Sequence, residues 1–145
     1  MKRTIFSWIC PLLILSIIVF TGCSAKSAAT AEQFQTAAEK VGYTVEEQEA
    51  GSVESIHMAS KDDSAMVFYV CSSESDAKTA LTNLKNNLPD DAKPEHVDSS
   101  YYTRYTAETE ASYYSIIRMG STVLASAVDI SEKDNVLTVV NELGY

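Results

Sequence analysis

The residue best placed for nucleophilic chemistry is Cys71, which ends an apolar stretch two residues before a helix-start signal at Ser73. A helix N-terminus lowers the pKa of a nearby thiol, and His57 or His96 could complete a cysteine–histidine pair. No motif around Cys71 supports a nucleophile, however, and a small apolar side chain in a buried strand explains it more simply. We therefore favour a structural role for Cys71.

Other chemistry-bearing patterns are missing from the sequence. His57 alternates with Ile56 and Met58 in an expected strand, so it should face solvent, and His96 lies in a polar connection. Structural zinc needs about four ligands with paired spacing. No EF-hand, phosphate-binding, dinucleotide-binding or serine-hydrolase motif occurs, and acidic pairs at 62–63 and 90–91 fit solvated turns. We expect no metal and no cofactor, although 20 acidic residues leave a general acid–base pair open.

Tyrosine is concentrated in two adjacent stretches that should pair as a hairpin. Five of the eight tyrosines lie within 14 positions: Tyr101, Tyr102, Tyr105, Tyr113 and Tyr114. Alternate members of each strand share a face, and Arg118 should lie on the same side as Tyr114. Tyrosine offers rigid amphipathic area for peptides, glycans or proteins, but it also stabilises sheets through cross-strand pairs. We favour the stabilising role and keep Tyr102, Tyr114 and Arg118 as candidate binding residues.

The N-terminus has the pattern of a secretory signal. Lys2 and Arg3 precede an uncharged, mostly apolar run from Ile9 to Phe20, which is the order of a positive region and an apolar region in such signals. A membrane-spanning helix would need about 20 apolar residues, whereas Ile5 to Phe20 offers 16, interrupted by Ser7, Pro11 and Ser16. An ordinary cleavage site would fall among the small residues 24–29, several positions beyond the run.

The next residues, Phe20-Thr21-Gly22-Cys23, resemble the lipobox of bacterial lipoprotein signal peptides. Phe20 departs from that pattern, in which leucine is more usual. The resemblance implies that residues 1–22 are a removed signal peptide and that Cys23 carries the lipid, with palmitate-type acyl chains. The protein would then be held at the cell membrane, on its extracytoplasmic side. Two or more acyl chains anchor a protein stably.

Charge excludes one class of partner and limits another. Loss of Lys2 and Arg3 with the signal peptide would change the formal net charge from -9 to -11. Such an acidic chain repels phosphate backbones, so we expect no nucleic-acid partner. It should also stand off an anionic lipid surface, although a short tether at 23–29 would keep it near the bilayer. With Cys10 removed and Cys23 lipidated, Cys71 has no partner for an internal disulfide.

Residues 30–145 should form a single domain with three amphipathic helices. Thr30 and Gln33 form a capping-box pattern at the start of the first helix, and Gly42 ends it. The second and third helices should begin at Ser73 and Ser131, each followed by acidic residues in the first turn. The similarity of these two starts hints at an internal repeat, although good helix starts converge on this pattern.

Strands are expected at 44–48, 53–60, 65–71, 101–108, 112–119 and 122–130. The stretch from Met66 to Cys71 is apolar on both alternating faces, as in a central strand. Short connections favour antiparallel pairing. We expect an α+β fold of order α-βββ-α-βββ-α, with an antiparallel sheet of four to six strands and the helices packed on one face.

The whole chain resembles the small exported lipoproteins of Gram-positive bacteria that have one α+β domain and no known activity. The resemblance rests on the lipobox, the short tether, the opening helix with Thr30, Glu32 and Phe34, and the terminal residues 142–145. It supplies no functional residues.

We therefore expect a membrane-anchored, non-enzymatic binding or interaction module of the cell envelope, with an envelope protein, peptide or glycan as partner. A cell-wall hydrolase or thiol enzyme, using Cys71 or a carboxylate pair, is the alternative. A structural or inhibitory partner without a ligand of its own is a third interpretation.

Overall fold

The computed structural model describes residues 26–90, 92 and 94–145. The expected signal peptide and Cys23 lie outside the described residues. In the part of the chain that is described, no helix has the length and apolar character needed to cross a membrane.

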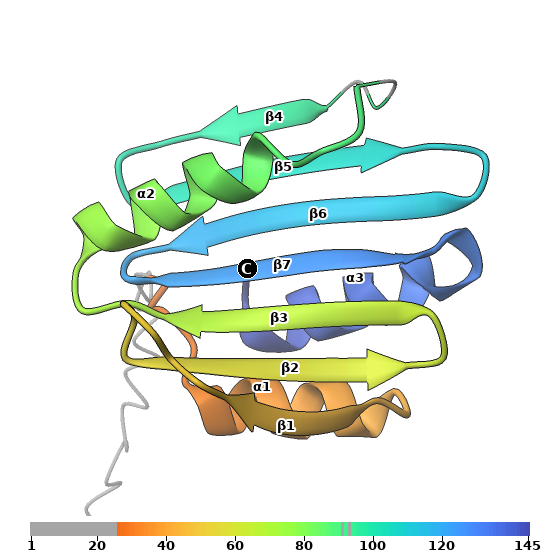
Figure 1. Cartoon of the computed structure of the whole chain (residues 1–145), viewed down its shortest axis with the longest axis horizontal. Helices are drawn as coiled ribbons and strands as arrows, with labels where there is room; N and C mark the ends of the chain where they lie inside the picture. Colours follow the sequence, from red (N-terminus) through yellow and green to blue (C-terminus); the bar gives the residue numbers. More distant parts are fainter. Residues whose placement is uncertain (1–25, 91, 93) are drawn as a thin grey trace, which may run out of the picture.

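Seven strands form one antiparallel sheet with the order β1-β2-β3-β7-β6-β5-β4 (Figure 1). The strands are β1 (Thr44–Gln48), β2 (Ser55–Lys61), β3 (Ser64–Val70), β4 (Glu95–Asp98), β5 (Tyr102–Glu108), β6 (Ser112–Met119) and β7 (Thr122–Asp129). Two meanders meet in the centre, where Phe68 of β3 lies opposite Leu124 of β7. The predicted α+β class and antiparallel pairing are confirmed.

Within the described residues, three α-helices and one 3-10 turn accompany the sheet: α1 (Ala31–Lys40), α2 (Glu74–Lys85), η1 (Ile130–Glu132) and α3 (Lys133–Leu143). The predicted caps of the first two helices are confirmed, because Thr30 and Gln33 form a capping box and Ser73 accepts a hydrogen bond from the Asp76 amide. At the third, the predicted cap by Ser131 is wrong. A 3-10 turn capped by Asp129 precedes the helix, and Glu132 at the helix start makes no capping side-chain hydrogen bond.

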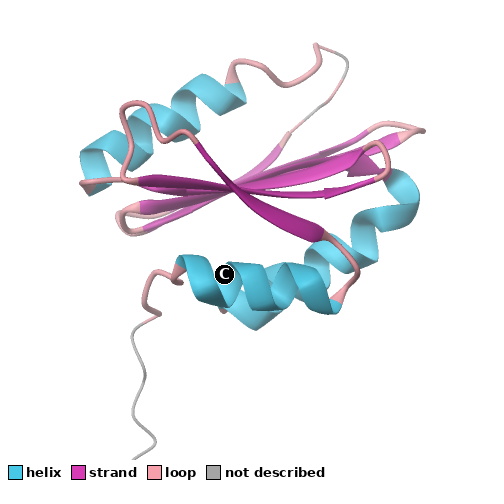
Figure 2. Ribbon diagram, turned by 60° about the horizontal axis from the view of Figure 1, so that its bottom comes forward, coloured by secondary structure: helices cyan, strands magenta, loops and turns pink. Residues whose placement is uncertain are grey.

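The prediction that all helices pack on one face was wrong. Helices α1 and α3 cover one face of the sheet, whereas α2 covers the other (Figure 2). Successive residues of the central strands explain this, because Ile117 and Leu124 join the core under α1 and α3 while Ile116 and Val123 join the core under α2. A sheet that is apolar on both faces must be covered on both.

The strand count also exceeds the predicted range of four to six, because β4 occupies the segment expected to be a polar connection. All four of its residues are exposed, and it pairs only with β5 at the edge of the sheet. A strand without a buried face has no apolar alternation, so the sequence carries no signal for it.

The described residues form two buried clusters, one on each face of the sheet. Phe34 of α1 stacks on Phe68 of β3, with ring centroids 5.1 Å apart, in the larger cluster. Cys71, Ala77 and Leu81 lie in the smaller cluster under α2. A segment with its own core can be produced and studied alone.

The N-terminal residues contact one end of the sheet, which we call the tether end. The strand register places four connections at this end: 49–54, 71–73, 99–101 and 120–121. The Ala28 amide donates to the Tyr101 hydroxyl at 3.2 Å, and the Ala29 amide donates to the Tyr145 hydroxyl at 3.3 Å. The last residues of the expected tether are therefore fixed to the domain.

Candidate ligand-binding groove

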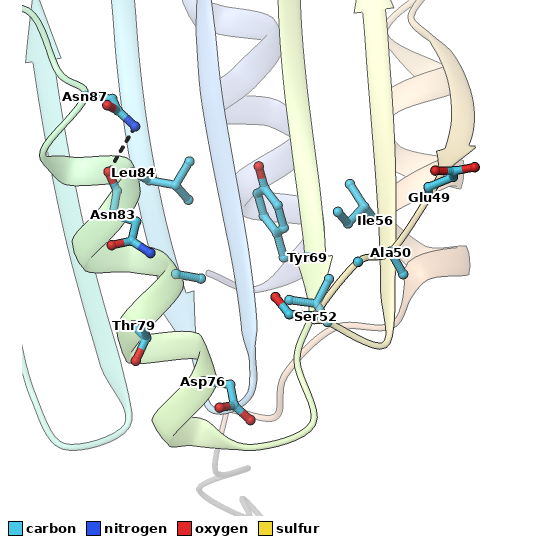
Figure 3. A pocket seen from close by; sticks show the side chains of 13 residues that line it. Glu49, Ala50, Ser52, Ile56, Tyr69, Asp76, Thr79, Asn83, Leu84 and Asn87 are labelled. Atoms are coloured by element: carbon cyan, nitrogen blue, oxygen red, sulfur yellow. Dashed lines mark hydrogen bonds between the residues drawn. The ribbon is translucent and has the colours of Figure 1, made fainter.

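Helix α2 leaves part of its own face of the sheet uncovered. It packs on β6 and β7, and an open groove of about 470 Å³ lies between it and the connection from β1 to β2 (Figure 3). We call this space the α2 groove. Its volume falls in the range of small-molecule and peptide sites.

The floor of the α2 groove is apolar. Ile56 and Tyr69 lie opposite each other in the β2–β3 ladder and line the groove. Met58 and Val67 form the next pair on the same face of the sheet. All four side chains are half-buried, so a ligand that covered them would remove further apolar surface from water.

One wall of the groove is the side of α2. Ala80 and Leu84 supply its inner, apolar row next to the floor. Its outer row is polar and comprises Asp76, Thr79, Asn83 and Asn87. Residues three or four apart share one side of a helix, so both rows follow directly from the sequence spacing. The wall can therefore meet a ligand that has both apolar and polar groups.

The opposite wall is the connection from Glu49 to Val53. The Val53 amide donates to the Ala50 carbonyl at 3.0 Å, which closes a turn, and Gly51 supplies its left-handed conformation with φ +56°. The Glu54 amide then donates to the Val70 carbonyl at 2.9 Å, which ties the connection to the end of β3. This wall is consequently held in place by backbone hydrogen bonds.

The charges of α2 are divided between its two sides. Asp76 borders the groove, and Glu49 lies on the opposite wall. The lysines of α2 are on the other side: Lys78 lines the space next to Arg118, and the Lys85 ammonium lies 5.0 Å from the centre of the Tyr105 ring. The groove therefore has an acidic border without lysine or arginine among its described lining residues.

The structure argues against Cys71 as a nucleophile. Its side chain is buried under α2. Burial, and then the nearby carboxylates of Asp76 and Glu54, raise the pKa of the thiol. A nucleophilic cysteine needs a lowered pKa and access to solvent, so the position next to a helix start does not produce a reactive thiolate here.

The carboxylates do not show the pattern of a general acid either. Among the described residues, the carboxyl groups with a clearly shifted pKa all have it lowered: Glu32, Asp98, Asp129 and Glu132. A general acid at neutral pH needs a raised pKa. No group of three metal-ligating side chains is found in these described segments.

The structure does not bring Tyr102, Tyr114 and Arg118 together. Tyr114 and Arg118 do lie on the face that carries α2, because they pair with Ala127 and Val123 of β7. Tyr102 is on the opposite face, where it packs against the larger core.

Arg118 is only 1% exposed, so it cannot serve as a surface ligand contact. It holds the connection 99–101 instead. Its Nη1 donates to the Tyr101 carbonyl at 3.1 Å, and its Nη2 donates to the Ser99 and Ser100 carbonyls at 3.2 Å each. The Thr103 hydroxyl accepts from Nη2 and donates to Asp98 at 2.6 Å. The buried guanidinium of Arg118 thus donates its hydrogen bonds to groups of the domain itself.

The two histidines lie apart from the groove. His57 is half-buried on the face of the sheet that carries α1, where its Nε2 is 3.2 Å from the Ser55 hydroxyl. His96 of β4 stacks on Tyr105, with ring centroids 4.8 Å apart. His96 is therefore part of a strand rather than of a connection.

Sequence reasoning missed the α2 groove because its residues come from three separate segments: the connection 49–53, the strand positions Ile56 and Tyr69, and one side of α2. The mixed row of Asp76, Thr79, Asn83 and Asn87 reads as an ordinary solvated helix side. The one available signal was the half-apolar character of β2, which suggests a face with incomplete cover. No protein-family model matches the sequence, and no curated protein and no solved structure matches the chain.

Proposed function

We propose that this chain is a lipid-anchored, extracytoplasmic binding module and that the α2 groove is its ligand site. The observation that carries the binding role is the apolar floor of Ile56 and Tyr69, which α2 leaves open. An apolar concavity with a few convergent polar groups is the usual form of a binding site. The surrounding walls are fixed by backbone hydrogen bonds, so the site needs little reorganisation to bind.

The anchor is proposed from the sequence. The lipobox-like residues end at Cys23, five positions before Ala28, whose amide donates to the Tyr101 hydroxyl of the domain. Five residues span at most about 18 Å. A lipid at Cys23 would therefore hold the tether end of the sheet next to the bilayer, and the connection 49–53 of the groove lies at this end.

The anchor is tested with the Cys23→Ala variant in cells fed a labelled fatty acid. The proposal expects loss of the label, while a Cys71→Ala variant keeps it. Fatty-acid labelling of the Cys23→Ala variant at the level of the unchanged protein would refute the anchor.

The groove is tested with residues 26–145 and the neutral apolar dye N-phenyl-1-naphthylamine, whose fluorescence rises on leaving water. Ala80 lies on the inner wall, so Ala80→Phe should fill the groove and remove most of the fluorescence increase. Ser75→Phe is the matched control, because Ser75 is exposed on the same helix and does not line the groove. Equal dye binding by the two variants would contradict the groove as the site.

A further inference from the structure

The border of the α2 groove selects the charge of its ligand. Asp76 stands on the α2 side and Glu49 on the other wall, while Glu46 is exposed on the same face of the neighbouring strand β1. The lysines of α2 point to the far side of the helix. A ligand in the groove therefore meets carboxylates on both sides, which favours ammonium or guanidinium groups.

The length of the groove indicates how large the ligand is. Its α2 wall extends from Asp76 to Asn87, 11 residues further along the chain, and comprises most of α2 and the turn that follows its last residue, Lys85. At 1.5 Å per residue this wall is roughly 16 Å long. An extended peptide rises about 3.3 Å per residue, so about five residues would fill the groove.

The outer row of α2 offers the acceptors that a peptide needs. Asp76 contributes a carboxylate, and Asn83 and Asn87 each contribute a side-chain amide whose oxygen is an acceptor, along the outer edge of the groove. Such oxygens accept hydrogen bonds from backbone N–H groups and from ammonium groups. A peptide with alternating side chains could thus direct apolar residues to Tyr69 and Ile56 and polar groups to the helix.

Two other occupants fit less well. A second copy of this acidic chain would bring carboxylates against the carboxylates of the border, which opposes association. An acyl chain would cover the floor but would leave the polar row of α2 without partners, at a cost in desolvation.

We infer that the α2 groove binds a short cationic and apolar peptide segment, about five residues long in extended form. This inference rests on the proposed function and adds the class of its ligand. Cationic amphipathic peptides concentrate at anionic membrane surfaces, so the proposed anchor at Cys23 would place the groove where they gather.

The test uses three peptides that differ only in charge. They are acetyl-Val-Lys-Trp-Lys-Val-amide, whose apolar and charged side chains alternate, and its twins with Gln or Glu in place of both Lys residues. Residues 26–145 contain no tryptophan, because the single one is Trp8, so the peptide's own fluorescence reports binding. We expect the Lys peptide to bind at least about tenfold more tightly than the Glu peptide, and added salt to narrow the difference.

Variants then place the bound peptide. Ala80→Phe should abolish binding, and Ser75→Phe should preserve it. Glu49→Gln should lower the affinity for the Lys peptide by about threefold, because an exposed charge pair contributes only that much. The affinity for the Gln peptide should not change. Glu110→Gln, in the exposed turn between β5 and β6, is the matched control and should change neither.

The outcomes separate this inference from the proposed function. Equal binding of the Lys and Glu peptides, or Lys-peptide binding that Ala80→Phe leaves intact, would overturn the inference. If no peptide binds but Ala80→Phe still removes binding of the neutral dye, the groove remains the proposed ligand site and the peptide is refuted as its ligand. A dimer in sedimentation that Ala80→Phe disrupts would identify a second copy as the occupant and would also refute the peptide.

Discussion

Ile56 lies directly opposite Tyr69 across the β2–β3 ladder, and the two side chains form an apolar floor that α2 leaves partly open. On the same face of the sheet, Ile116 and Val123 are fully covered by α2. The difference arises because α2 connects β3 with β4 at the far edge, so it crosses the second meander and leaves the first one open. The groove is thus a direct consequence of the strand order.

The contact between Ala29 and Tyr145 should be important for stability. The Tyr145 hydroxyl is buried, accepts from the Ala29 amide and shares a hydrogen bond with the Thr122 hydroxyl. Tyr145→Phe leaves the Ala29 amide without its acceptor, while the Thr122 hydroxyl keeps only its bond to the Met119 carbonyl. The variant should lower the free energy of unfolding by about 1–2 kcal/mol. Urea unfolding measures this. Tyr101→Phe is the control: its hydroxyl accepts from Ala28 at an exposed site, so an equally large loss there would contradict the account.

Arg118 should be a structural residue rather than a ligand contact. Hydrogen bonds to a charged group contribute roughly 1.5–3 kcal/mol each, and Arg118 makes several to the connection 99–101. We expect Arg118→Met to lower the free energy of unfolding by at least about 3 kcal/mol. Arg104 is half-buried on the other face of the sheet from Arg118. Arg104→Met should therefore lower the free energy of unfolding by less than about 1 kcal/mol in the same urea titration. If Arg118→Met lost as little free energy of unfolding as Arg104→Met is expected to lose, the carbonyl contacts of Arg118 would contribute little to stability.

Cys71 should react slowly with thiol reagents. Its side chain is buried, and its pKa is raised by that burial. Iodoacetamide should modify the folded protein at least about 100-fold more slowly than the urea-unfolded protein, because only the open form reacts. A Cys71→Ser, Ser72→Cys double variant places the thiol at the exposed neighbouring position and should react quickly. Rapid labelling of Cys71 itself would revive the thiol-enzyme alternative.

Glu132 should make the domain sensitive to acid. Its carboxylate accepts hydrogen bonds from Lys61 at 2.8 Å and Asn135 at 2.8 Å, and these contacts, that of Lys61 first, hold its pKa below the ordinary value of 4.5. A lowered pKa in the folded state stabilises the protein above the unfolded pKa, and that contribution is lost as the pH falls through the folded pKa.

The urea midpoint should therefore fall when the pH is lowered from about 6 to about 3. Glu132→Gln, which cannot ionise, should show a smaller fall than the unchanged protein. Asp134→Asn is the control, because Asp134 is exposed in the first turn of α3. An identical pH dependence for the Glu132→Gln variant would show that this carboxylate does not contribute to acid stability.

Local features of the fold could be predicted from the sequence, whereas their arrangement could not. The capping box of Thr30 and the cap of Ser73 depend only on neighbouring residues, and the structure has both. The apolar stretch from Met66 to Cys71 correctly indicated a central strand, β3. The edge strand β4 escaped prediction because its four residues are all exposed.

The position of α2 depends on the long-range pairing of β3 with β7, which no local pattern encodes. The groove could not be predicted for the same reason, because Glu49 and Asp76 reach opposite sides of it only through that pairing. Strand alternation correctly predicted that Arg118 shares a face with Tyr114, and both pair with β7 on that face. No local pattern indicated that the Arg118 guanidinium would be buried against backbone carbonyls.

The central claim, that the α2 groove is the ligand site, is tested most directly by mapping backbone amide chemical shifts of residues 26–145 during titration with N-phenyl-1-naphthylamine. The account predicts saturable shifts confined to the connection 49–53, to Ile56 and Tyr69, and to residues 76–87 of α2 and its C-terminal turn. The amides around Tyr102 and Tyr114 should stay unchanged. Shifts centred on the tyrosine-bearing strands, or none at concentrations where the dye is soluble, would contradict it.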